Sequence, residues 1–171
     1  ELAAAAVAAA PHLFTPAFWR SFAALSLALA ATSFMNVSVF PGFDAVFAYA
    51  RDISVTSHAV ALIALGLVAT FRPAVLRVNA LNIGALALLA LGCTLPLALG
   101  LGSVPLLVLA SCALAVGRAW CILVAGIAAS RLSLAQASVL VPLAFVVQCA
   151  ASAFAWLLPV WFGMLFFLVA P

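Results

Sequence analysis

Long apolar runs constrain the fold of this chain more than any other sequence feature. Five such runs cover residues 18–40, 43–71, 79–101, 104–130 and 134–158. Each is long enough to cross the roughly 30 Å hydrocarbon core of a bilayer as a helix. A helix also satisfies its backbone hydrogen bonds internally, as lipid requires. The sequence therefore predicts an all-α, polytopic transmembrane helix bundle with five full spans.

Two end segments flank these runs. Residues 1–17 include an alanine-rich tract, for which we expect an N-terminal tail or an interfacial helix. Residues 160–171 are apolar but rise only about 18 Å as a helix, too little to cross a bilayer. We therefore expect a sixth segment that is truncated or lies at the membrane interface.

The composition excludes several classes of protein. Hydrophobic residues make up 70% of the 171 residues and charged residues only 5%, whereas soluble domains carry about 25% charged residues. A surface with so little charge would not stay in solution, which excludes a soluble enzyme, a nucleic-acid-binding domain and a disordered tail. The few arginines are also scattered rather than clustered, unlike those of a nucleic-acid-binding surface. The expected partner of most of the surface is the lipid bilayer, and we expect no nucleic acid to be bound.

The arginines predict the orientation of the bundle. Arg20 precedes the first span, Arg72 and Arg77 separate the second from the third, and Arg131 follows the fourth. With strictly alternating spans, all of them fall on one side, and the connections on the other side carry no cation. Because basic loops remain in the cytoplasm, the sequence predicts a cytoplasmic N-terminus.

No motif for catalysis, a cofactor or a metal is present. The four cysteines lie inside apolar runs without a C-x-x-C pair, which is typical of buried hydrophobic residues; they are Cys93, Cys112, Cys121 and Cys149. There is also no nucleophile elbow, zinc-binding His-Glu pattern or glycine-rich phosphate loop. We therefore expect neither an enzyme nor a cofactor.

Arg118 is the most unusual residue, because it lies near the middle of the fourth span. Charge inside a membrane is costly and usually marks a functional site. Asn36 and Gln148 are polar residues in the first and fifth spans, and we expect them to converge with Arg118 on an outward-opening cavity. The alternatives are that Arg118 pairs with Asp44 or Asp52 for structure only, and that the amides join helices.

Charges also gather at the start of the second span. If that run forms one helix, Asp44, Arg51 and His58 recur every seven residues and lie on one stripe, with Asp52 beside it. Asp44 in the first turn would suit the helix dipole. The alternative is that residues 43–56 form a short external interfacial helix whose charges face water.

Small residues predict where helices approach closely. In the fourth span they recur every four residues, at Ala113, Gly117, Cys121, Ala125 and Ala129. The third span carries Gly84 and Gly92 on a similar row, followed by Pro96, which predicts a kink. Such rows allow close helix packing in lipid.

The topology resembles one six-helix half of a major facilitator superfamily transporter. The loop over residues 70–77 carries the arginines of that family's loop motif, although not its Gly and Asp. Gly117-Arg118, followed by Gly126 and Ser130, is similar to the family's fourth helix. The chain also resembles the membrane portion of bacterial LuxR-type regulators. Either resemblance implies half of a unit, completed by a homodimer partner or by a missing second half.

We expect a transporter-like domain of the bacterial inner membrane that binds a small polar or anionic ligand in the outward cavity. Arg118 would anchor the ligand, Asn36 and Gln148 would contact it, and the second-span charges would act as a gate or coupling pair. The alternatives are a ligand-sensing membrane domain of a transcriptional regulator and a structural membrane subunit without transport activity.

Cysteine labelling tests the predicted orientation. In a variant without the native cysteines, single cysteines beside Arg20, Arg77 and Arg131 are expected to resist a membrane-impermeant maleimide in intact spheroplasts. All three are expected to react after the membrane is opened, because they lie on the cytoplasmic side. Labelling of only one or two of them in intact spheroplasts would contradict the alternation of the spans.

Overall fold

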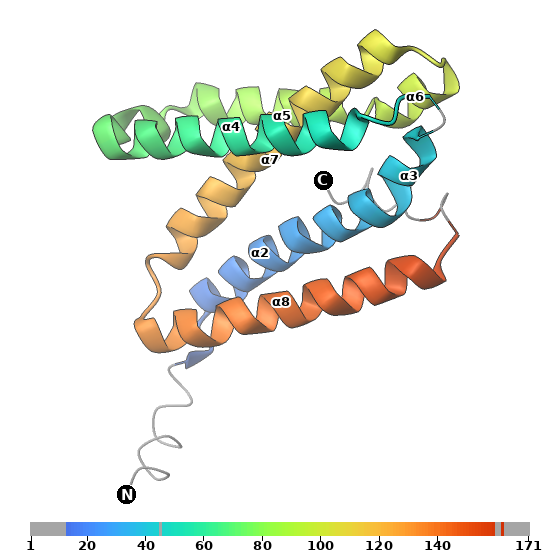
Figure 1. Cartoon of the computed structure of the whole chain (residues 1–171). Coiled ribbons are helices and arrows are strands. Elements are labelled where there is room, and N and C mark those ends of the chain that lie inside the picture. Colours follow the sequence, from blue (N-terminus) through green and yellow to red (C-terminus); the bar gives the residue numbers. More distant parts are fainter. Residues whose placement is uncertain (1–12, 45, 160–161, 163–171) are drawn as a thin grey trace, which may run out of the picture.

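The computed structural model describes residues 13–44, 46–159 and 162, and within them it contains helices and no strands (Figure 1). The elements are α2 (Pro16–Phe34), the π-helical turn η1 (Met35–Val39), α3 (Phe40–Phe43), α4 (Ala50–Phe71), the 3-10 turn η2 (Pro73–Arg77), α5 (Asn79–Gly92), α6 (Leu95–Gly100), α7 (Val104–Ala129) and α8 (Leu134–Leu157). The all-α prediction is confirmed. Most of the predicted tail (1–17) and all but one residue of the sixth segment (160–171) lie outside the described residues.

The described part of the chain contains five helical stretches that are long and apolar enough to cross a membrane. They are Pro16–Phe43, Ala50–Phe71, Asn79–Ala98, Val104–Ala129 and Leu134–Leu157. The predicted number of full spans is confirmed, and the protein is a multi-pass membrane protein. The third, fourth and fifth spans begin at the predicted residues, whereas the boundary between the first two differs.

The first span continues through Pro41, where the sequence analysis ended it. Before the proline, η1 forms a wider turn. In this turn the Phe40 N–H donates to the Met35 carbonyl, which lies one residue further back than the usual partner in an α-helix. A proline in a regular α-helix clashes with the carbonyl four residues earlier. The wider π-helical turn relieves this conflict, and the helix therefore ends at Phe43.

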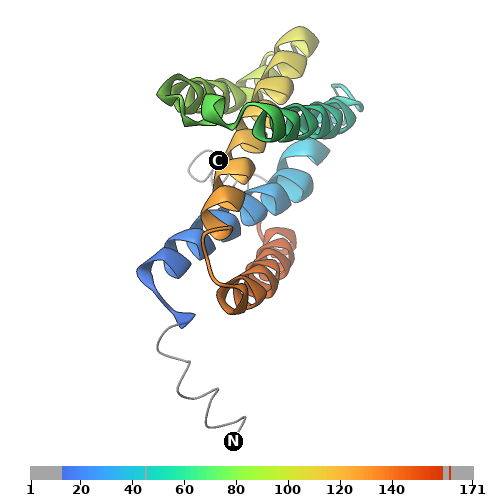
Figure 2. The same ribbon diagram turned by 90° about the vertical axis from the view of Figure 1, so that its left-hand side faces the viewer.

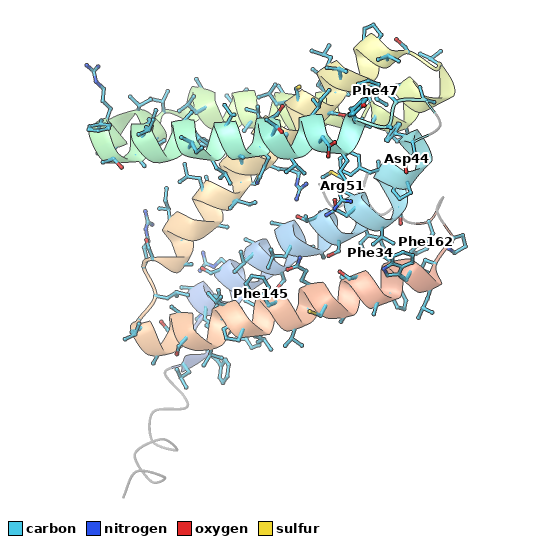
Figure 3. The ribbon with its side chains drawn as sticks, viewed as in Figure 1. Phe34, Asp44, Phe47, Arg51, Phe145 and Phe162 are labelled. Carbon is cyan, nitrogen blue, oxygen red and sulfur yellow. The ribbon has the colours of Figure 1, made fainter. Side chains whose placement is uncertain are left out.

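The second span begins at Ala50, seven residues later than the predicted Phe43. Asp44 is the C-cap residue of α3, and a turn follows it. A hydrogen bond of 3.2 Å from the Ala50 N–H to the Phe47 carbonyl closes this turn. Asp44, Phe47 and Arg51 all lie at this turn (Figure 3). The prediction of one helix over residues 43–71 is therefore wrong.

The third span breaks where the kink was predicted. The regular helix α5 ends at Gly92, and α6 begins at Leu95, immediately before Pro96. The Cys93 N–H still bonds the Leu89 carbonyl at 2.9 Å. Pro96 falls in the first turn of α6, where a helix needs no backbone donor.

The helix α7 is the centre of the bundle and packs against α2, α4, α5 and α6. Cys112 and Ala115 contact α4, whereas Leu114 and Gly117 contact α5. Residues two positions apart point about 200° apart on a helix. The helices α4 and α5 therefore lie on opposite sides of α7, as Figure 2 shows, while α2 and α8 pack together beside its C-terminal half.

The directions of the packed helices agree with successive membrane crossings. Spans one and five, α2 and α8, run parallel; spans two and four, α4 and α7, also run parallel; spans three and four, α5 and α7, run antiparallel. The helices α2 and α8 are joined by the contacts Thr15–Gln136 and Ser33–Ser152. The contacts of α4 with α7 are Ser57–Cys112 and His58–Ala115. Those of α5 with α7 are Asn82–Trp120 and Gly92–Leu114. A chain that crosses a bilayer five times must alternate in this way.

This alternation brings the loop arginines to one end of the molecule. Arg20 near the start of α2, Arg72 after α4 and Arg131 after α7 are all exposed there. In Figure 1 this arginine-bearing end lies at the left, and the α3–α4 and α6–α7 connections lie at the right. We refer to the right-hand end as the opposite end.

The contact of α5 with α7 is close enough to require glycine at position 92. A Cβ added to Gly92 would lie 2.6 Å from the Cβ and 2.8 Å from the Cα of Leu114, whereas a Cβ at Gly84 would meet nothing within 4 Å. We expect Gly92→Ala to destabilise the bundle by about 1–3 kcal/mol through overpacking. The matched control Gly84→Ala is expected to be neutral or to stabilise by about 0.5–1 kcal/mol. Unfolding in mixed micelles measures both, and equal effects would contradict the close contact.

Candidate ligand-binding site

Arg118 lies near the middle of α7 and reaches toward α2. Its Nη2 donates to the Thr32 hydroxyl, and its Nη1 donates to the Met35 sulfur at 3.4 Å. The side chain is partly buried. No carboxylate among the described residues forms an ion pair with it. Arg118 is therefore a cation at membrane depth whose neighbours carry no opposite charge.

The contacts of Arg118 leave much of its hydrogen-bonding capacity unused. A guanidinium carries five N–H donors in a planar fork, and the described contacts use two of them. The Thr32 hydroxyl in turn donates to the Ala28 carbonyl at 2.8 Å, so its oxygen is held in place to accept from Arg118. The remaining donors suit a planar or tetrahedral anion.

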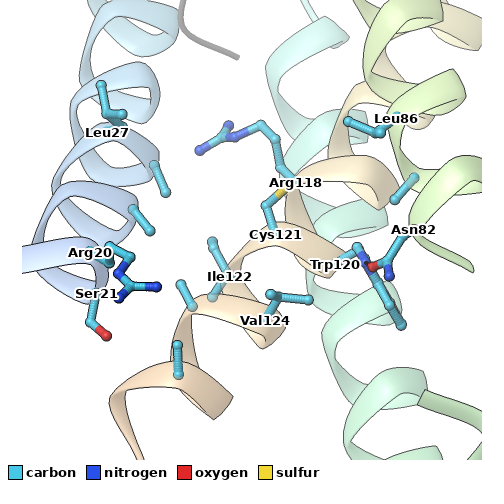
Figure 4. Close-up of a pocket in the computed structure, with 15 residues that line it drawn as sticks. Arg20, Ser21, Leu27, Asn82, Leu86, Arg118, Trp120, Cys121, Ile122 and Val124 are labelled. Atoms are coloured by element: carbon cyan, nitrogen blue, oxygen red, sulfur yellow. Dashed lines mark hydrogen bonds between the residues drawn. The ribbon is translucent and has the colours of Figure 1, made fainter. Parts of the chain in front are cut away.

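Arg118 lines a cavity of about 490 Å³ between α2, α5 and α7 (Figure 4). Such a volume is within the usual range of small-molecule sites. The lining is mostly apolar; its residues are Arg20, Ser21, Ala24, Leu27, Ala28, Asn82, Ala85, Leu86, Arg118, Trp120, Cys121, Ile122, Val124, Ala125 and Ala128. Small residues of α7, among them Cys121 and Ala125 of the predicted row, leave the space that forms the cavity.

The cavity extends from mid-membrane toward the arginine-bearing end. It follows α2 from Arg20 to Ala28 and α7 from Arg118 to Ala128. The sequence predicted a cavity on the other side of Arg118, toward the opposite end of the molecule. The structure differs from this prediction, because the space between the helices is filled there. A buried apolar cluster occupies it, formed by Met35, Val39, Phe40, Phe43, Ala50, Leu89, Leu95, Ala98, Leu107, Ala110 and Leu114.

The two amides predicted to join Arg118 make no hydrogen bond with it. Asn36 lies in η1, directly after Met35, and its side chain has no hydrogen-bond partner in the described part of the chain. Gln148 lies on α8, one turn before Ser152, whose hydroxyl bonds that of Ser33 on α2 at 2.8 Å. The Gln148 Oε1 is buried and has no hydrogen-bond partner among the residues that the structure describes. Neither amide lines the cavity.

The charges of the second span do not form the predicted stripe. Asp44 belongs to the end of the first span, so it does not share a helix with Arg51 and His58. Asp52 occupies the first turn of α4, where a carboxylate suits the helix dipole. The His58 Nδ1–H donates to the Ala115 carbonyl at 3.0 Å and so joins α4 to α7.

The alternative interpretations of these charged residues also disagree with the structure. The helix α4 is continuous from Ala50, so residues 43–56 do not form a separate interfacial helix. In the described residues Arg118 pairs with neither Asp44 nor Asp52, and Arg51 pairs with neither of them. Arg51 and Asp52 are exposed at the opposite end.

Sequence reasoning missed two contacts near the cavity. Met35 accepts a hydrogen bond from Arg118, but a methionine in an apolar run gives no signal of such a role. The Trp120 Nε1–H donates to the Asn82 Oδ1 at 2.9 Å. Asn82, an amide inside an apolar span, is a signal that could have been noticed, because such groups need a partner in lipid.

Comparison of the chain with models of known protein families, with curated proteins and with solved structures gave no match in any of the three. The resemblance to facilitator-type transporters and to LuxR-type regulators therefore stays a prediction. What can be inferred about function comes from the cavity and from Arg118.

Replacing Arg118 with an apolar residue of similar length tests whether its charge serves the fold. A cation at the centre of a membrane costs about 2.5–3.5 kcal/mol, which two ordinary hydrogen bonds offset only in part. We therefore expect Arg118→Met to stabilise the protein by about 1–2 kcal/mol in thermal or denaturant unfolding in micelles. Destabilisation by Arg118→Met would show that the arginine serves the fold.

Proposed function

We propose that this chain is the ligand-binding membrane domain of a bacterial inner-membrane protein and that it holds a small organic anion at Arg118. The observation that carries the proposal is a mid-membrane guanidinium that lines a cavity and has no carboxylate partner among the described residues. A cation that is costly to place inside a membrane is expected to serve binding.

An anionic ligand supplies what the site lacks. Its charge compensates Arg118 in surroundings of low dielectric constant, where the attraction is stronger than in water. Its oxygen atoms accept the guanidinium N–H groups that Thr32 and Met35 leave free. A cationic ligand would face repulsion from Arg118, and no carboxylate lines the cavity to attract it.

Ligand access is proposed from the cytoplasm. Arg20 lies at the arginine-bearing end of the cavity, and the arginine distribution assigns this end to the cytoplasmic face. The apolar cluster closes the other side of Arg118. A cavity that extends toward one face, with packed side chains on its other side, suits one of the two states of a transporter.

Transport by this domain would require a partner half. The facilitator-like resemblance implies that a second copy, or sequence beyond this chain, supplies the other half and that the halves rock around the ligand. In a sensing domain, the same bound anion would instead shift the population of two conformations. Flux measurements distinguish the two roles.

Binding of ionised sulfonates tests the proposal. We expect nanodisc-embedded protein to bind at least one member of a series from methanesulfonate to octanesulfonate. Arg118→Gln is expected to weaken this binding about 10- to 100-fold, because charge-assisted hydrogen bonds are lost. Isothermal titration measures the affinities. Arg131→Gln is the matched control, since Arg131 is exposed and lies outside the cavity.

The outcomes separate the candidate roles. Binding together with Arg118-dependent uptake of the same sulfonate into proteoliposomes supports a transporter. Binding without uptake supports a sensing domain. If no sulfonate in the series binds in a manner that depends on Arg118, the proposed function is wrong.

A further inference from the structure

The wall of the Arg118 cavity is apolar between two cationic ends. Arg118 lies at the mid-membrane end and Arg20 at the arginine-bearing end (Figure 4). Aliphatic side chains of all three helices form much of the rest of the wall, including Leu27 on α2, Leu86 on α5 and Ile122 on α7. A fully hydrophilic ligand would lose its hydration along this wall without receiving hydrogen bonds in return.

The polar groups in the wall are largely occupied by the protein itself. The Trp120 indole N–H donates to Asn82, and the Arg20 Nε–H donates to the Pro16 carbonyl at 3.3 Å. Arg20 keeps further N–H donors, but it is exposed, whereas Arg118 is partly buried and keeps unused donors at membrane depth. At that depth the cavity therefore offers one strong anchor for a charged group and little for hydroxyl or amide groups elsewhere on a ligand.

From this arrangement we infer that the site selects amphiphilic monoanions, in which one ionised acid group is joined to an unbranched or slender apolar body. The acid group binds Arg118, and the apolar body lies along α2 toward Arg20. This inference rests on the proposed function and adds the class of ligand. A soluble alkyl or aryl acid and an anionic lipid share this chemistry.

The length of the cavity limits the length of the apolar body. Arg20 and Ala28 bound the lining on α2, and eight residues of helix rise about 12 Å. Bodies up to this length bury all of their methylene groups against the wall. Longer bodies would reach past Arg20 into the headgroup region, where further methylenes gain less.

A chain-length series tests the inference. In nanodiscs of zwitterionic lipid, we expect the Arg118-dependent affinity for alkanesulfonates to rise about fourfold per methylene from methanesulfonate onward. The Arg118→Gln variant corrects for partitioning of longer sulfonates into lipid. Ala24→Leu, which narrows the cavity between Arg118 and Arg20, is expected to weaken hexanesulfonate binding more than ethanesulfonate binding. Ala153→Leu, on the exposed surface of α8, is the matched control.

The same experiment separates failure of the inference from failure of the proposed function. Arg118-dependent binding that is equal for all chain lengths would keep the proposed function and overturn the selection for apolar bodies. Absence of Arg118-dependent binding at every length would overturn both. An unchanged length dependence in Ala24→Leu would also overturn the inference, because it would place the apolar body elsewhere.

Titration with anionic lipid identifies the source of the ligand. If added phosphatidylglycerol displaces hexanesulfonate from the wild-type protein, the site accepts lipid headgroups, and the anion is a membrane component. If hexanesulfonate binding is insensitive to phosphatidylglycerol, the site takes soluble amphiphilic acids. Both results support an amphiphilic anion.

Discussion

The close approach of α5 to α7 sets the arrangement of the other helices. At Gly92 and Gly117 the two helices come so near that a Cβ atom would collide with Leu114 or Leu89. Lipid gives helices no hydrophobic reason to associate, so such contacts and a few interhelical hydrogen bonds must hold the bundle. With α5 on one face of α7 and α4 on the opposite face, α2 packs beside the C-terminal half of α7.

The position of Arg118 follows from this packing. Its face of α7 is directed toward α2, where, in the described part of the chain, the Thr32 hydroxyl and the Met35 sulfur are the hydrogen-bond partners of the guanidinium. Toward one end, the buried apolar cluster fills the space between the helices. Toward the other, the alanines and Cys121 are too small to fill it, and the cavity remains. The same small residues that permit close packing of α7 thus create the space beside its charge.

The sequence predicts the spans well because composition and run length alone decide whether a helix can cross a membrane. It misplaces the turn between the first two spans, because Pro41 was taken as a stop and the π-helical turn before it leaves no mark in a hydropathy pattern. That error assigned Asp44 to the wrong helix. Arg118 is recognisable from its position in an apolar run. Its partners Thr32 and Met35 are not, since they depend on which faces of two distant helices meet.

The choice of arginine at position 118 is consistent with a site that needs a permanent cation. A lysine amine readily gives up its proton in surroundings of low dielectric constant, whereas a guanidinium keeps its charge. A lysine without a nearby carboxylate would therefore tend toward the neutral form and lose its attraction for anions. Arginine also presents several donors in one plane, so it can bond Thr32 and Met35 and still offer N–H groups to the cavity. Its fixed charge and spare donors are together what anion recognition at membrane depth requires.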